Sequence, residues 1–104
     1  MKKLIDILIK NFCIPINNQE QFESLNPNSK ILALSNSQGG YYMFKKKYCF
    51  LNRGKIKINV NDLIGAVYIG ENIIKRITKE VKRFNRGYWE FNLNQVYNIN
   101  GKNP

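Results

Sequence analysis

The sequence predicts an α+β domain in which a mostly antiparallel sheet of four to five strands is accompanied by two amphipathic helices. Three observations lead to this prediction. Residues 1–12 carry apolar side chains at helical spacing, residues 41–60 contain two β-rich runs separated by a turn, and residues 73–86 again follow a helical period. With 104 residues, the chain is expected to form a single domain, 1–104, around one modest core.

Charge is distributed unevenly along the chain. The sequence contains 17 Lys and Arg residues and 7 Asp and Glu residues, which gives a net charge of +10. Residues 1–29 contain equal numbers of basic and acidic groups, so the surplus lies in a basic body at 30–104. Such a body attracts polyanions, of which nucleic acid is the commonest and an anionic membrane surface the next. Codon bias in an AT-rich organelle, virus or phage genome also favours lysine, together with Asn, Ile, Tyr and Phe.

The N-terminal segment is expected to form a short amphipathic helix that caps the core. Its apolar positions at helical spacing are Leu4, Ile5, Leu8 and Phe12. Pro15 marks the end of this helix. Charged residues interrupt the apolar run, so we expect no transmembrane segment. A peripheral membrane or partner contact through residues 1–12 is a second interpretation.

A polar stretch separates this helix from the predicted sheet. Residues 17–29 are rich in turn-forming residues, and we expect a loop with one helical turn around 19–24. Residues 30–34 form a short apolar run that predicts a buried strand. A flexible turn is expected at 36–40.

Residues 41–60 are predicted to form a central basic hairpin, whose register the sequence leaves open. In one register, a three-residue turn at 52–54 places Tyr48 and Phe50 in the core. In the other, a two-residue turn places Cys49 and Leu51 in the core and leaves aromatic rings among the lysines. We favour the first register because it buries more aromatic area.

The C-terminal half is expected to supply the remaining strands and the basic helix. Residues 63–69 are nearly continuous in apolar side chains and predict a central strand, while 88–93 and 96–99 predict two more, with Trp89 as a core anchor. Between them, 73–86 predicts an amphipathic helix whose exposed arc is basic. A strand at the start of that segment is the alternative, because β-branched residues are frequent there.

The function that these patterns favour is nucleic-acid binding, with RNA preferred, as a structural component of a ribonucleoprotein particle such as a ribosome. Aromatic residues alternate with lysines in 41–60, and rings on a sheet stack on unpaired bases while lysines contact phosphates. Neighbouring proteins of the particle are further expected partners. Of the candidate contacts, Lys55 and Lys57 face outward in both hairpin registers. The candidate contact residues are Lys45, Lys47, Arg53, Lys55, Lys57, Lys75, Arg76, Lys79, Lys82, Arg83 and Arg86.

An alternative is a structural subunit of an organellar or viral protein assembly, in which the basic surface meets an acidic partner. Catalysis by a serine–histidine or cysteine–histidine pair is excluded because the chain has no histidine. Its two cysteines, Cys13 and Cys49, lack metal-ligand spacing, so we expect no metal and no cofactor. Two free thiols are typical of a reducing, intracellular compartment.

Four short segments occur in the order seen in the signal peptidase and self-cleaving repressor family, and they resemble its motifs. They are SLNP at 24–27, RGKI at 53–56, IKRI at 74–77 and VYNING at 96–101. The resemblance implies a β-rich fold with Ser24 as nucleophile and Lys75 as its base, and it forms a second alternative function. The chain departs from the family at Leu25, where the family has methionine, and it lacks the Gly-Asp pair after the proline.

Overall fold

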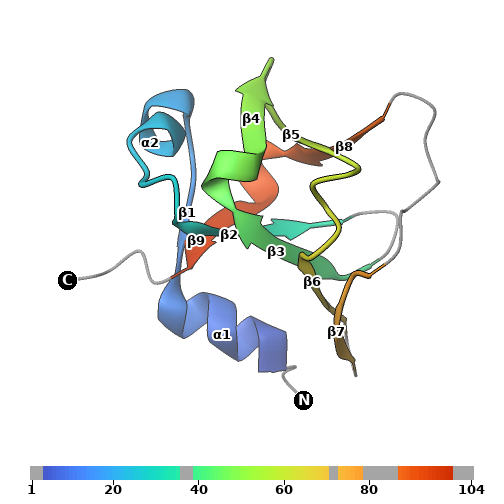
Figure 1. Ribbon diagram of the computed structural model, residues 1–104. Helices are drawn as coiled ribbons and strands as arrows, with labels where there is room; N and C mark the ends of the chain where they lie inside the picture. The colour runs from blue at the N-terminus through green and yellow to red at the C-terminus, as the bar shows by residue number, and fades with distance from the viewer. Residues whose placement is uncertain (1–3, 36–38, 71–72, 79–86, 100–104) are drawn as a thin grey trace.

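The computed structural model describes residues 4–35, 39–70, 73–78 and 87–99 (Figure 1). Within these residues the chain forms nine strands and two short α-helices. The strands make up two antiparallel sheets, one of six strands and one of three. The fold is therefore mostly β, and the predicted α+β domain with one sheet of four to five strands is wrong.

The larger sheet collects strands from both ends of the chain. Its members, in spatial order, are β1 (Cys13–Pro15), β9 (Val96–Ile99), β2 (Lys30–Leu34), β3 (Tyr41–Lys45), β6 (Val67–Ile69) and β7 (Ile74–Arg76). The predicted strands at 30–34 and 96–99 are both present. Pairing of β1 and β2 with β9 ties the N-terminal region to the end of the described chain.

The smaller sheet consists of β4 (Cys49–Asn52), β5 (Lys55–Asn59) and β8 (Tyr88–Asn92), in that order. The chain passes between the sheets through two short 3-10 turns. The first, η1 (Lys46–Tyr48), joins β3 to β4, and the second, η2 (Leu93–Gln95), joins β8 to β9. The run expected to form one long hairpin strand is thus divided between two sheets.

The inner faces of the two sheets share one hydrophobic core. Trp89 is buried in it, as predicted, and its ring meets that of Tyr42 edge-on with 5.4 Å between centroids. Because side chains alternate along each strand, this core determines which residues face outward. The core residues contributed by the strands are Ile31, Ala33, Tyr42, Phe44, Ile56, Ile58, Trp89, Phe91 and Val96.

The two helices relate differently to this core, because only the second contributes a side chain to it. Helix α1 (Leu4–Phe12) is present as predicted, but it packs against β1 and β9, on the side of the larger sheet away from the smaller one (Figure 1). Helix α2 (Gln19–Glu23) matches the expected helical turn, and Asn18 caps it by accepting a hydrogen bond from the Gln21 amide at 2.8 Å. Phe22 anchors α2 to the core.

The predicted basic helix at 73–86 is wrong where the structure describes it. Ile74–Arg76 form β7, an antiparallel partner of β6, which agrees with the alternative of a strand. Ile74 is 64% exposed, so the helical spacing of apolar residues here does not mark a buried face. β-branched side chains instead favour the extended backbone that pairs with β6. Residues 79–86 lie outside the described residues.

The predicted central strand at 63–69 is shorter than expected. Only Val67–Ile69 form a strand, β6, and residues 61–65 form turns. Gly65 has a φ of +98°, a left-handed conformation that interrupts an extended strand. Leu63 is nevertheless fully buried, so the apolar character of this segment comes partly from a turn that packs into the core.

Candidate nucleic-acid interface

The hairpin register decides which side chains of the smaller sheet face outward. Cys49 and Leu51 lie opposite the buried isoleucines of β5, and the connecting turn consists of Arg53 and Gly54 alone. Their φ angles are +55° and +76°, and positive values at both positions define a type I′ turn. The register favoured from the sequence is therefore wrong, and the two-residue turn is present.

This register leaves two aromatic rings on the surface. Tyr48 is 44% exposed and Phe50 is 42% exposed. Within the hairpin alone, burying these two rings would remove the larger aromatic area from water. In the folded chain, the rings of Tyr42, Trp89 and Phe91 fill the space beneath β5 instead. These rings come from strands distant in sequence, so the hairpin sequence does not show that they occupy the core.

Rings and charged groups lie side by side on the outer surface of the smaller sheet. Phe50 is paired with Lys57 on β5, and Lys57 is paired with Glu90 on β8. The Phe50 ring meets the Tyr88 ring edge-on, with 5.7 Å between centroids, and Tyr88 is 41% exposed. We name this surface the small-sheet face and define it by Phe50, Lys55, Lys57, Tyr88 and Glu90.

One carboxylate on this face forms ion pairs with two lysines. Glu90 lies 3.8 Å from the Lys55 amine and 3.4 Å from the Lys57 amine. All three side chains contact solvent, so these ion pairs are weak and are screened by salt. Because two cations share a single acid, the face keeps a positive charge that a phosphate can use.

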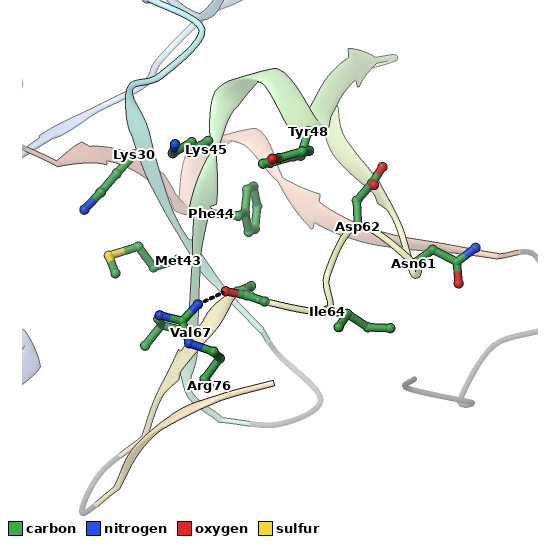
Figure 2. A pocket seen from close by; sticks show the side chains of 12 residues that line it. Lys30, Met43, Phe44, Lys45, Tyr48, Asn61, Asp62, Ile64, Val67 and Arg76 are labelled. Carbon is green, nitrogen blue, oxygen red and sulfur yellow. Dashed lines mark hydrogen bonds between the residues drawn. The ribbon is translucent and has the colours of Figure 1, made fainter. Parts of the chain in front are cut away.

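A second group of cations lines a pocket of about 540 Å³ beside the larger sheet (Figure 2). Lys30 and Lys45 lie opposite each other in β2 and β3, and Arg76 comes from β7. Tyr48 also lines it, so the turn η1 connects it with the small-sheet face. We name this site the basic pocket. Lys45 and Arg76 were candidates from the sequence, whereas Lys30 was missed because only the strand register places it beside Lys45.

Consecutive lysines at the start of η1 have different surroundings. Lys45 lines the basic pocket, and the amine of Lys47 lies 5.5 Å from the centre of the exposed Tyr48 ring. Lys46 instead donates hydrogen bonds to the backbone carbonyls of Leu25 at 3.0 Å and Glu23 at 3.3 Å. A sequence of three lysines therefore supplies two cations to the surface and one internal anchor.

The remaining candidates are spread over the molecule. Arg53 lies at the tip of the β4–β5 turn. Lys75 lies on β7, with its amine 5.9 Å from the centre of the Tyr68 ring. The other four candidate cations lie outside the described residues, and they are Lys79, Lys82, Arg83 and Arg86.

The described residues do not bring the proposed serine–lysine pair together. Ser24 ends α2, where its hydroxyl donates to the Gln21 carbonyl at 2.9 Å. Lys75 lies on β7, on the opposite side of the molecule (Figure 1). A serine nucleophile activated by lysine requires the two side chains in hydrogen-bond contact.

The cysteines and carboxylates show no arrangement for metal chemistry in the part of the chain that is described. Cys13 and Cys49 are both free thiols, and burial raises the pKa of Cys49 from its usual 9.0 to about 12. Its thiol lies 3.2 Å from the Lys46 carbonyl and can donate a hydrogen bond to it. No group of three or more metal-ligating side chains occurs among the described residues.

Comparisons with protein-family models, with curated proteins and with solved structures find no match to this chain. Among the residues described, no helix is both long and apolar enough to cross a membrane. Fold and surface together define a small antiparallel β protein in which two sheets share a core and carry two separate groups of surface cations.

Proposed function

We propose that this protein binds single-stranded RNA through the small-sheet face, as a structural component of an intracellular ribonucleoprotein particle. The observation that carries the proposal is the pair of exposed rings, Phe50 and Tyr88, beside Lys57. Exposed aromatic rings on a sheet offer flat surfaces to unpaired bases, and the adjacent lysines contact the phosphates between them.

The geometry of the face supports stacking more than base-specific recognition. Phe50 and Tyr88 belong to β4 and β8, the strands on either side of β5, so their rings lie above the middle of the sheet. Stacking of one base on an aromatic ring contributes about 1–3 kcal/mol and tolerates any base. We therefore expect binding with little sequence preference.

Substitution of the two rings tests this proposal. Phe50→Leu and Tyr88→Leu keep apolar bulk but remove the stacking surface, and each is expected to weaken binding of a labelled single-stranded RNA by about tenfold. Fluorescence anisotropy measures the affinity. Phe12→Leu is the matched control, because Phe12 is also exposed but lies on α1. Absence of RNA binding at low salt, or equal affinity in all three variants, would overturn the proposal.

Neighbouring proteins are proposed as further partners in the particle. Ile7, Phe12 and Ile14 expose large apolar side chains on α1 and β1. Such a group of side chains suits a contact with another protein. Nuclease treatment of the native complex distinguishes a particle held together by RNA from the alternative of a purely protein assembly, since only the former would come apart.

A further inference from the structure

We infer that the basic pocket binds a nucleotide, with the phosphate against Lys30, Lys45 and Arg76 and the base against the ring of Tyr48. This inference concerns a different surface from the small-sheet face and does not depend on RNA binding there. It rests on the charge of the pocket, on the placement of its cations, and on its mixed lining.

The charge of the pocket is less compensated than that of the small-sheet face. Three cations and one acid, Asp62, line it. Within the described residues, Lys30 and Lys45 have no ion-pair partner, whereas Lys55 and Lys57 share Glu90. Moreover, Lys30 and Lys45 are direct cross-strand neighbours. Like charges in that position destabilise a sheet, and a bound anion relieves their repulsion.

Arg76 is held in position for an anion. Its Nη1 donates a hydrogen bond to the Gly65 carbonyl at 2.8 Å, which fixes the guanidinium at the pocket (Figure 2). A guanidinium carries five N–H donors, so this bond leaves others free for phosphate oxygens. A fixed arginine loses less conformational entropy on binding than a mobile one.

The rest of the lining suits a flat, partly apolar group attached to that anion. Met43, Phe44 and Val67 contribute apolar surface, and Tyr48 contributes an exposed ring (Figure 2). A volume of about 540 Å³ lies within the range of roughly 300–1,000 Å³ that is common for small-molecule sites. Inorganic phosphate alone would leave this apolar lining unused.

Asp62 favours a nucleotide ligand that carries few phosphate groups. In Figure 2 its carboxylate lies across the pocket from Lys30 and Lys45. A carboxylate in the lining repels additional phosphate groups. The pocket therefore fits a ribonucleoside monophosphate better than a triphosphate.

A free nucleotide and the phosphorylated end of an RNA strand share this chemistry. Isothermal titration of the full chain with AMP, adenosine, inorganic phosphate and ATP tests the inference, and we expect AMP to bind more tightly than any of the other three. Competition between AMP and short oligoribonucleotides with and without a 5′-phosphate identifies the source. Displacement by the phosphorylated strand alone assigns the pocket to strand ends, and displacement by neither assigns it to free nucleotides.

Matched charge removals locate the site. Lys45→Gln and Arg76→Gln are each expected to weaken AMP binding by about tenfold, because each removes a charged hydrogen-bond donor. The double variant Lys55→Gln/Lys57→Gln removes charge from the small-sheet face and should leave AMP binding unchanged. Lys45 is exposed, so the fold is expected to survive its substitution, and circular dichroism checks this.

Three results would overturn the inference. They are AMP binding that is no tighter than the binding of phosphate and adenosine, an unchanged AMP affinity in Lys45→Gln, and a loss of AMP affinity in Lys55→Gln/Lys57→Gln equal to that in Lys45→Gln. Failure of the proposed RNA-binding function can be distinguished from failure of this inference. A protein that binds AMP in the pocket but does not bind single-stranded RNA contradicts only the function of the small-sheet face.

Discussion

Lys57 and Glu90 lie directly opposite each other in β5 and β8, with 3.4 Å between the amine and the carboxylate. Since Glu90 also contacts Lys55, it competes with any phosphate for both lysines of the small-sheet face. We expect Glu90→Gln to increase the affinity for single-stranded RNA by about two- to fivefold at low salt, as an exposed ion pair is worth up to ~1 kcal/mol. Fluorescence anisotropy measures this increase.

The gain should decrease as salt is added, because salt screens exposed charges. Glu20→Gln is the control, since it makes the same change of charge on α2, away from the small-sheet face. If both variants bind RNA equally well, the effect comes from net charge and not from the release of these lysines.

The β4–β5 turn makes a prediction about stability. Arg53 adopts a φ of +55°, which asparagine tolerates well and β-branched residues tolerate poorly. Arg53→Asn is therefore expected to be at least as stable as the natural chain, and Arg53→Val less stable by about 1 kcal/mol. Urea denaturation measures both. Equal stability of the two variants would mean that Arg53 does not have a left-handed conformation.

Gly40 permits close contact between β3 and β6. A Cβ atom at this position would lie 2.5 Å from the Tyr68 hydroxyl oxygen and 2.8 Å from the backbone carbonyl oxygen of Ile69. Gly40→Ala is expected to lower the free energy of unfolding by about 1–3 kcal/mol, because the backbone cannot move aside. In a Tyr68→Ala background the loss should be smaller, and a double-mutant cycle measures the difference. Full additivity would contradict the contact.

The partly buried thiol of Cys49 makes stability depend on pH in the alkaline range. Its pKa is raised from 9.0 to about 12 in the folded chain, so above pH 9 the unfolded chain loses this proton first. Folding stability that involves this thiol is therefore present below pH 9 and is lost progressively up to about pH 12.

Cys49→Ala removes this dependence. The difference in unfolding free energy between the natural chain and the variant is expected to shift by about 1 kcal/mol between pH 8 and pH 10, in favour of the variant. Denaturation at several pH values measures it. Below pH 8 the difference should stay constant, and a constant difference over the whole range would contradict the raised pKa.

Several elements of this fold can be predicted from local sequence. Helix α1, strands β2, β8 and β9, and the burial of Trp89 follow from apolar periodicity and aromatic character alone. The division into two sheets cannot be predicted in this way. The turn η1 contains neither glycine nor proline, so nothing in its composition separates β3 from β4.

The candidate site was predictable only in part, for a related reason. Lys55 and Lys57 face outward in either register, and they do so in the structure. Exposure of Phe50 depends on which rings fill the core, and those rings come from distant strands. Likewise, Lys30 joins Lys45 only through the pairing of β2 with β3, a long-range contact that local patterns do not record.

The corner at η1 turns one run of three lysines into three independent mutational targets. Replacing Lys46 removes donors to two backbone carbonyls and should lower stability without changing a ligand-contacting surface. Replacing Lys45 removes a cation from the basic pocket, while replacing Lys47 removes the cation beside the exposed Tyr48 ring. A mutational screen of these three consecutive lysines would therefore yield three separable phenotypes.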